Sequence, residues 1–263
     1  AVILIVGTNS DWETEGNDRS NLDLPSNQDE LIEEVCKLNK NTVVVLNTGS
    51  PCLMPWVEEA GSILQCWFPG QEFGNSLSDI IFGKINPSGK LPTTFPKSIE
   101  DTPAYATYPG KDLQMDYEEG LYIGYRWYDE EEIDPLFPFG HGLSYTSFDY
   151  SNLRAIPPKG NASVAAFEFE ISNTGDVAGK EVIQGYINVP DSKIDRPRKE
   201  LKKFTKIYLE AGETQKVKFE LSERELSFWN VDLHAWQVEP AEYIFEIGAS
   251  SNDIRGSASV WLG

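Results

Sequence analysis

Several residue types that define common functional classes are scarce in this sequence of 263 residues. Its three cysteines, Cys36, Cys52 and Cys66, are too few and too widely spaced for a disulfide framework or for paired zinc ligands. Its two histidines, His141 and His234, exclude a histidine-rich metal site, and neither lies beside a G-x-S-x-G nucleophile motif. We therefore expect no metal and no other cofactor, and we interpret the cysteines as small buried apolar side chains.

Basic residues and long apolar runs are also scarce. The chain has 22 Lys and Arg against 42 Asp and Glu, a formal net charge of −20. A field of that sign repels phosphate groups, so neither nucleic acid nor an anionic membrane surface is an expected partner, whereas a neutral sugar meets no such barrier. No run of 18 apolar residues is present, so we expect no membrane-spanning helix. With 40% hydrophobic and 12% aromatic residues, the composition is that of a folded chain of one large or two ordinary domains.

Apolar runs at residues 1–7, 42–46 and 62–68 predict three strands in the first part of the chain. Because residues 1–7 (AVILIVG) are apolar throughout, we expect the first strand to be buried on both faces, with neighbours on both sides. The chain is accordingly interpreted as the carboxy-terminal piece of a longer protein. Strands that alternate with helical patterns are typical of a parallel sheet with right-handed crossovers.

Helical spacing appears between these strands. Ser26 and Asp29 resemble a capping box, and the following helix is expected to turn its apolar face inward. Its expected inward positions are Leu31, Val35 and Leu38. A short helical segment is expected at residues 55–60, and residues 71–82 predict a second amphipathic helix that ends at Gly83.

Residues 86–145 are rich in proline and aromatic side chains and have little periodicity. We interpret them as a long ordered connection whose aromatic side chains pack against protein. These side chains are Tyr117, Tyr122, Tyr125, Trp127, Tyr128, Phe137 and Phe139.

Beyond residue 145 the apolar pattern alternates with a period of two, which predicts antiparallel strands. The expected inward positions are Phe167, Phe169, Ile171, Val217, Phe219, Leu221, Tyr243, Phe245 and Ile247. The expected fold class is therefore α/β plus all-β: a partial α/β sandwich with a mostly parallel sheet, followed by an immunoglobulin-like β-sandwich of the fibronectin type III variety. The expected domain boundaries are 1–96, 97–147 for the aromatic-rich connection, and 148–263.

The second half of the chain also contains a lysine cluster and a glycosylation sequon, and neither indicates a catalytic site. Lys199, Lys202, Lys203 and Lys206 form a basic cluster that we expect to be a solvated strand face. The sequon at residues 161–163 (NAS) is a weak sign of a secreted chain, and it leaves the compartment open.

The loop at residues 7–19 (GTNSDWETEGNDR) is the first candidate for chemistry, because sites of open parallel sheets lie beyond the carboxyl ends of the strands. It gathers four carboxylates around Trp12 and Arg19. Such a cluster can keep one carboxyl group protonated for general acid/base work, with an aromatic wall beside it. The competing interpretation is a solvated acidic loop.

A series of motifs runs along nearly the whole chain in a fixed order. The main ones are EGNDR (15–19), LDLP (22–25), QDELI (28–32), VVVL (43–46), PGQEFG (69–74), NPSGKLPTTFP (86–96), GYR (124–126), FPFGHGLSYT (137–146), NTG (173–175) and GASSNDIR (248–255). In this order the chain resembles the family three glycoside hydrolases. The ordered combination is specific, although each piece alone is weak.

The resemblance implies a retaining β-glycosidase built from a barrel domain, an α/β sandwich domain and a fibronectin type III-like domain. It implies that the nucleophile is an aspartate on the barrel, which this chain lacks, and that the general acid/base is a glutamate matching Glu15. Retaining hydrolysis needs two such carboxyl groups, one to attack the anomeric carbon and one to exchange a proton with the leaving oxygen and then with water.

Glu13 is the alternative for that role, because side chains two residues apart in extended backbone face the same way. We prefer Glu15 because it matches the motif and because Gly16 beside it allows the backbone to bend. Trp12 is expected to stack on a substrate sugar or aglycone, or alternatively to pack on protein. Asp18 and Arg19 are interpreted as structural residues that fix the loop by ion pairing.

The sequence therefore predicts the carboxy-terminal portion of a β-glucosidase that releases terminal non-reducing β-D-glucosyl residues, with Glu15 as its acid/base. The expected partners are a β-glucoside substrate and the missing barrel domain, and a homo-oligomer is compatible with the sequence. Two alternatives stay open: a β-xylosidase of the same family, and a non-catalytic carbohydrate-binding or structural module.

Overall fold

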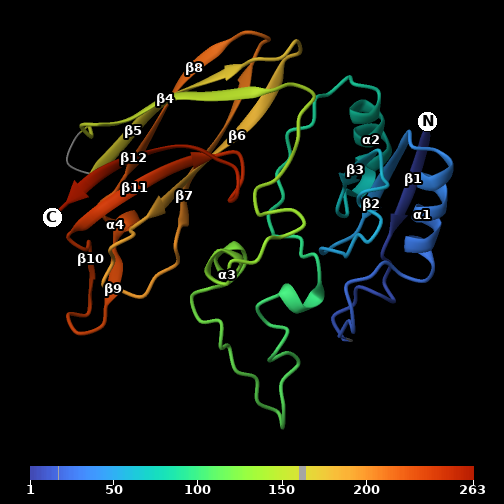
Figure 1. The fold of residues 1–263 in the computed structure, drawn as a ribbon, viewed down its shortest axis with the longest axis horizontal. Helices are drawn as coiled ribbons and strands as arrows, with labels where there is room; N and C mark the ends of the chain where they lie inside the picture. Colours follow the sequence, from blue (N-terminus) through green and yellow to red (C-terminus); the bar gives the residue numbers. More distant parts are fainter. Residues whose placement is uncertain (17, 160–163) are drawn as a thin grey trace. The chain divides into compact units, whose positions relative to one another are not determined.

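The computed structural model describes residues 1–16, 18–159 and 164–263, which form two compact units. The first unit contains residues 1–81, 94–117 and 135–137, and the second contains residues 82–93, 118–134 and 138–263 (Figure 1). The sequon at residues 161–163 lies outside the described residues, as does Asn17 of the EGNDR motif.

The first unit is built on a three-stranded parallel sheet of order β1-β2-β3. Its strands are β1 (Val2–Gly7), β2 (Thr42–Asn47) and β3 (Ser62–Gln65). The central strand β2 is buried, with Val44, Val45 and Leu46 all at 0% exposure. The expectation that the first strand is buried on both faces is wrong: Ile3 is 46% and Ile5 53% exposed. Strand β1 is an edge strand of the described sheet, and that face is only partly covered.

Helix α1 (Gln28–Leu38) follows the candidate loop, but it does not begin with the predicted capping box. Its N-cap is Asn27, with no side-chain cap, and the carboxylate of Asp29 accepts a hydrogen bond from the indole N–H of Trp56 at 2.7 Å. Its buried positions are Ile32 and Cys36. The predicted inward positions shift accordingly: Leu31 is 48% and Leu38 87% exposed, and Val35 is half-buried.

The rest of the first unit follows the predicted order, with shorter elements. Residues 55–60 form turns rather than a helix. Strand β3 ends three residues before the predicted limit, and a 3₁₀ turn η1 (Gly70–Glu72) precedes helix α2 (Phe73–Ile81). The predicted end of this helix at Gly83 is confirmed by a left-handed φ of 70° there, a backbone conformation that favours glycine.

The proline-rich connection has little regular structure beyond η2 (Ile99–Asp101) and α3 (Tyr125–Glu130). Its aromatic side chains are buried unevenly: Tyr125 and Tyr128 are buried, whereas Tyr117 is 75% exposed, so the expected packing is wrong for Tyr117.

Part of this connection belongs to the second unit and is attached to it by specific contacts. The Tyr125 hydroxyl accepts a hydrogen bond from the backbone N–H of Leu201 at 2.8 Å, and its ring stacks on Phe139 with centroids 5.0 Å apart. Lys199 forms a 2.6 Å ion pair with Asp129 of α3 and is 8% exposed. The interpretation of the lysine cluster as a solvated face is therefore wrong for Lys199.

The second unit is an antiparallel β-sandwich. One sheet has the order β4-β5-β8 and the other β12-β11-β6-β7, with a separate hairpin β9-β10. The strands are β4 (Phe148–Ile156), β5 (Ala165–Asn173), β6 (Gly179–Asn188), β7 (Glu200–Leu209), β8 (Thr214–Leu221), β9 (Phe228–Asn230), β10 (Ala235–Gln237), β11 (Ala241–Gly248) and β12 (Ile254–Leu262), and a short helix α4 (Glu223–Leu226) precedes the hairpin.

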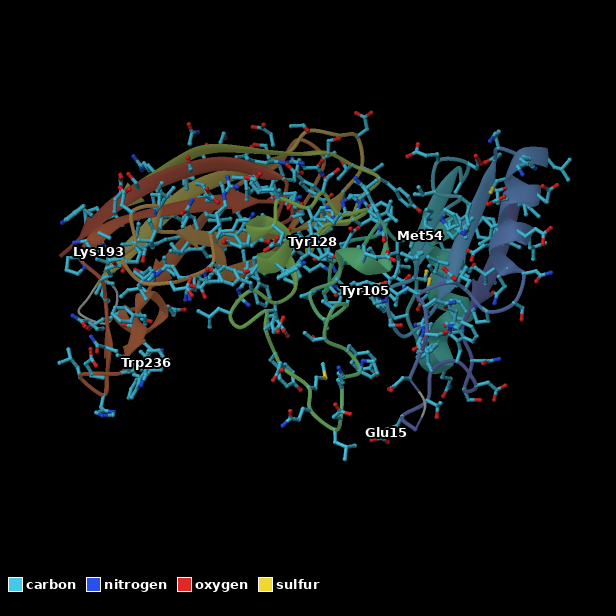
Figure 2. The ribbon with its side chains drawn as sticks, turned by 60° about the horizontal axis from the view of Figure 1, so that its bottom comes forward. Glu15, Met54, Tyr105, Tyr128, Lys193 and Trp236 are labelled. Atoms are coloured by element: carbon cyan, nitrogen blue, oxygen red, sulfur yellow. The ribbon has the colours of Figure 1, made fainter. Side chains whose placement is uncertain are left out.

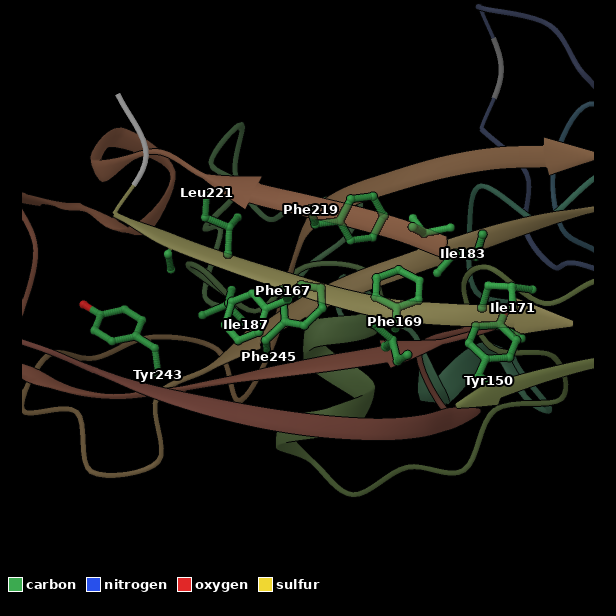
Figure 3. Packing of buried hydrophobic residues seen from close by; sticks show 14 of the residues in the cluster. Tyr150, Phe167, Phe169, Ile171, Ile183, Ile187, Phe219, Leu221, Tyr243 and Phe245 are labelled. Carbon is green, nitrogen blue, oxygen red and sulfur yellow. The ribbon is translucent and has the colours of Figure 1, made fainter. Parts of the chain in front are cut away.

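The core between the two sheets contains the predicted alternating side chains together with others, such as Tyr150, Ile183 and Ile187 (Figure 3). Phe167 of β5 stacks on Phe245 of β11 with centroids 4.3 Å apart and planes at 13°, so the two sheets pack face to face. All nine predicted inward positions are at most 8% exposed. The sequence prediction of an immunoglobulin-like sandwich is confirmed.

Candidate functional site

The candidate loop lies at the carboxyl end of the parallel sheet, where β1 and β2 end side by side. Gly7 pairs with Asn47 at the last position of the register, and the backbone N–H of Thr8 donates to the carbonyl of Asn47 at 3.2 Å. Gln28, the first residue of α1, accepts a hydrogen bond from Gly7 N–H at 2.8 Å and donates to its carbonyl at 2.9 Å. The start of the loop is thus fixed to the sheet and to the following helix.

A tight turn around Asn9 sets the direction of the loop. The Asn9 side-chain oxygen accepts from the N–H groups of Asp11 and Trp12 at 3.0 and 3.2 Å, and its carbonyl accepts from those of Trp12 and Glu13. Asparagine is suited to such turns because its side chain satisfies backbone donors that the turn leaves unpaired. The turn brings Glu13 back towards the sheet.

Glu13 is half-buried and bonded to both strand ends. Its Oε1 atom accepts a hydrogen bond from the Thr8 hydroxyl at 2.5 Å and another from the backbone N–H of Gly49 at 2.9 Å. Thr8 follows β1 and Gly49 follows β2. The carboxylate therefore joins the two loops at this edge of the sheet.

Glu15, in contrast, is exposed at the tip of the loop (Figure 2). No hydrogen bond or ion pair joins its carboxylate to any other described residue. Gly16 beside it has no left-handed φ, and a Cβ there would meet nothing within 4 Å, so the backbone does not require glycine at this position in the way the sequence analysis assumes. The free carboxylate is what a proton donor to an incoming substrate needs.

Asp18 and Arg19 are structural, but they do not pair with each other. The Asp18 carboxylate accepts a hydrogen bond from the Tyr108 hydroxyl, which raises the pKa of that phenol. Arg19 donates from Nη1 to the Ser50 hydroxyl at 2.6 Å. The expected ion pair is therefore wrong, because each residue has a partner from elsewhere in the first unit.

These residues line an open hollow of about 500 Å³. Its lining comprises Trp12, Glu13, Thr14, Glu15, Asp18, Arg19, Ser50 and Tyr108. Sequence reasoning missed Ser50 and Tyr108, since Tyr108 lies 90 residues from its partner Asp18 and no local pattern connects them. Trp12 is half-buried on the wall, and its indole N–H has no hydrogen-bond partner among the described residues.

The three carboxylates on the hollow differ in what they can do. Glu13 and Asp18 accept hydrogen bonds from protein donors, whereas the Glu15 carboxylate accepts none from the described residues. A carboxyl group that must exchange protons with a ligand needs geometric access to it. Of the three, only the Glu15 carboxylate has no hydrogen-bond or ion-pair partner among the described residues.

Metal binding and membrane insertion are two further possibilities for the part of the chain that the structure describes. No group of three or more His, Cys, Asp or Glu side chains there is arranged to hold a metal ion. Within the same ranges, no helix combines the length and the apolar character needed to cross a bilayer.

Two family models of known proteins match successive parts of this chain. A family model described as "Glycosyl hydrolase family 3 C-terminal domain" matches residues 1–145. The chain belongs to glycosyl hydrolase family 3. A second family model, "Fibronectin type III-like domain", matches residues 181–251 of this family 3 chain, within the β-sandwich. The resemblance on which the sequence prediction rests is confirmed.

Relatives of this family 3 chain match almost all of it. "Thermostable beta-glucosidase B" of Acetivibrio thermocellus is 43% identical over 98% of the chain, which spans 34% of that protein. A "Beta-glucosidase" of Rhizobium radiobacter is 41% identical over 99%, spanning 32% of it. The crystal structure of a Bifidobacterium adolescentis GH3 beta-glucosidase has a TM-score of 0.93 and 41% identity, covering 99% of this chain and 39% of that one. The chain thus spans about a third of the length of the curated relatives.

Proposed function

We propose that this chain is the carboxy-terminal portion of a retaining β-glucosidase that hydrolyses terminal non-reducing β-D-glucosyl residues. The observation that carries the proposal is an uncommitted carboxylate, Glu15, in a hollow of a chain whose full-length relatives bear the name beta-glucosidase. Glu15 acts as general acid/base, and a barrel domain outside these residues supplies the nucleophile.

The chemistry divides between the two carboxyl groups. Retaining hydrolysis places them about 5 Å apart: one attacks the anomeric carbon and forms a glycosyl-enzyme, while the other protonates the departing oxygen. Glu15 then takes a proton from the water that releases the sugar. Its exposed position at the tip of the loop suits this exchange, because it can reach a sugar bound outside the first unit.

Trp12 is proposed as a substrate-binding residue on the wall of the same hollow. A sugar ring presents a face of C–H groups that packs against an aromatic plane. Because Trp12 and Glu15 line the same hollow, we assign the ring to contact with the aglycone or a second sugar. Tyr108 supplies a second aromatic side chain to this lining.

The proposal is tested with the full-length enzyme and a pair of nitrophenyl substrates. We expect turnover of the β-glucoside with a higher kcat/KM than of the β-xyloside, and retention of the anomeric configuration in the first-formed sugar. A preference for the xyloside would reassign the substrate to a β-xylosidase. No turnover of any β-glycoside would favour a non-catalytic module. The isolated 263-residue chain should be inactive, because a retaining mechanism cannot proceed without its nucleophile.

A further inference from the structure

The candidate loop is attached to two neighbouring residues, Gly49 and Ser50, once before Glu15 and once after it. Before Glu15, the carboxylate of Glu13 accepts the N–H of Gly49. After Glu15, the guanidinium of Arg19 donates to the hydroxyl of Ser50. Glu15 therefore lies on a span of chain whose two ends are fixed at residues 49 and 50.

That segment is itself fixed to the sheet. The Thr48 hydroxyl donates to the carbonyl of Ser50 at 2.9 Å, and the side-chain amide of Gln65, at the end of β3, donates to the Thr48 hydroxyl at 3.0 Å. Thr48 is fully buried. The attachment points of the loop are thus connected through Thr48 to the ends of β2 and β3.

The anchor at Glu13 consists of two hydrogen bonds, one from Thr8 and one from Gly49. One carboxylate oxygen accepts from both the Thr8 hydroxyl and the Gly49 N–H, and bonds to an ionised acceptor are stronger than bonds between neutral groups. The backbone of Gly49 also packs against the other oxygen: a Cβ there would lie 2.2 Å from Oε2 of Glu13. This close contact restricts the movement of the Glu13 side chain, and with it the part of the loop that leads to Glu15.

We propose that Glu13 is a positioning residue that fixes Glu15 for proton transfer by joining the loop after β1 to the loop after β2. The inference rests on the proposed role of Glu15. Glu13 is assigned to positioning and not to proton exchange, because its Oε1 accepts two hydrogen bonds from the protein and its Oε2 lies against the backbone of Gly49. The two neighbouring glutamates thus have different roles: Glu13 fixes the loop, and Glu15 transfers the proton.

The proposal is tested by two substitutions of Glu13 in the full-length enzyme. Glu13→Ala removes the acceptor, and it should lower kcat for an alkyl β-glucoside, which needs acid assistance, by about 10- to 100-fold, the loss that a misplacement of about 1 Å produces. The loss should be much smaller for a dinitrophenyl β-glucoside. Glu13→Gln retains an oxygen that can accept both hydrogen bonds, so it should restore most of the activity.

The same two substitutions at Glu15 are the comparison. Glu15→Gln should not restore activity, because an amide cannot donate and recover a proton in this step. Azide should accelerate Glu15→Ala, since this anion attacks the glycosyl-enzyme directly and needs no base, and should not accelerate Glu13→Ala, in which the base for the attack of water is still present. Asp11→Ala is the matched control: it removes a charge from the same loop, but Asp11 is exposed and does not line the hollow, so wild-type kinetics are expected.

Each outcome separates the positioning role from the proposed function. If Glu15 behaves as acid/base while Glu13→Gln is as slow as Glu13→Ala, or while Glu13→Ala is unimpaired, the positioning role is overturned and the function stands. If azide rescues Glu13→Ala and not Glu15→Ala, the acid/base assignment itself is overturned. Turnover of the activated substrate shows whether each variant has folded, and a Glu13→Ala enzyme that loses this turnover equally overturns the positioning role.

Discussion

The backbone N–H of Gly49 donates a hydrogen bond to the carboxylate of Glu13 at 2.9 Å, in a contact that leaves no room for a side chain at residue 49. A Cβ there would come within 2.2 Å of Glu13 Oε2 and 2.6 Å of the Phe68 ring. The Phe68 ring is 56% exposed and has room to turn away, whereas the Glu13 carboxylate is bonded to Thr8 and to Gly49 itself. The Glu13 carboxylate must therefore shift if residue 49 is anything larger than glycine, and we expect the part of the loop bonded through it to shift as well.

This contact gives a first prediction for Gly49→Ala in the full-length enzyme. Displacing Glu13 should also displace Glu15, and it should therefore lower kcat for an alkyl β-glucoside by about 10-fold or more. Gly74→Ala, in helix α2, is the matched control, because a Cβ there meets nothing within 4 Å and alanine favours the helix by about 0.5–1 kcal/mol. Its kinetics should be unchanged. Equal kinetics for both variants would show that the contact does not position the loop.

A second prediction concerns the core of the β-sandwich. Phe245 is fully buried and stacks on Phe167, so Phe245→Ala should lower the free energy of unfolding of this unit by about 3–5 kcal/mol. Trp261 on β12 is 68% exposed, and Trp261→Ala should change it by about 0.5 kcal/mol or less. Urea denaturation followed by circular dichroism measures both. Similar losses for the two variants would contradict the described packing.

A third prediction concerns the pH dependence of stability. Burial lowers the pKa of His141 below its ordinary value of 6.5, the nearby Lys90 ammonium lowers it further, and Asp253 opposes both. As the pH falls below 6.5, the unfolded chain binds a proton at this histidine before the folded chain does. Protonation thus favours unfolding, and stability should be lost in the window just below pH 6.5.

The measurement is the melting temperature from about pH 7.5 to about pH 5.5, a range that spans histidine titration. His141→Gln should show a smaller decrease over this range than the wild type. His234→Asn is the control, since His234 is exposed and asparagine tolerates its positive φ of 48°. A His141→Gln variant with the wild-type decrease would show that this histidine does not titrate in the way its burial indicates.

The sequence predicted the elements with strong periodicity and missed those set by tertiary contacts. The alternation around Phe169 and Phe219 identified the sandwich core, because alternate side chains of a β-strand point to opposite faces of the sheet and one of those faces is buried. The start of α1 was predicted wrongly, since Asp29 has the residue type of a cap but is bonded to Trp56, which lies 27 residues away.

The candidate site was predictable to a similar extent. The EGNDR motif pointed to Glu15, and the structure leaves that carboxylate free on the hollow. The sequence could present Glu13 only as a rival, because its partner Gly49 lies 36 residues away on the next strand's loop. Tyr108 carried no signal at all. Contacts between loops at a sheet edge depend on the fold, and local spacing does not encode them.

The central claim is that Glu15 is the general acid/base, and kinetics of Glu15→Ala in the full-length enzyme test it most directly. The account predicts a loss of orders of magnitude for an alkyl β-glucoside, a far smaller loss for a dinitrophenyl β-glucoside, and acceleration by azide with β-glucosyl azide as the product, because azide attacks the glycosyl-enzyme without a base. Equal losses for both substrates with no glucosyl azide formed would contradict it.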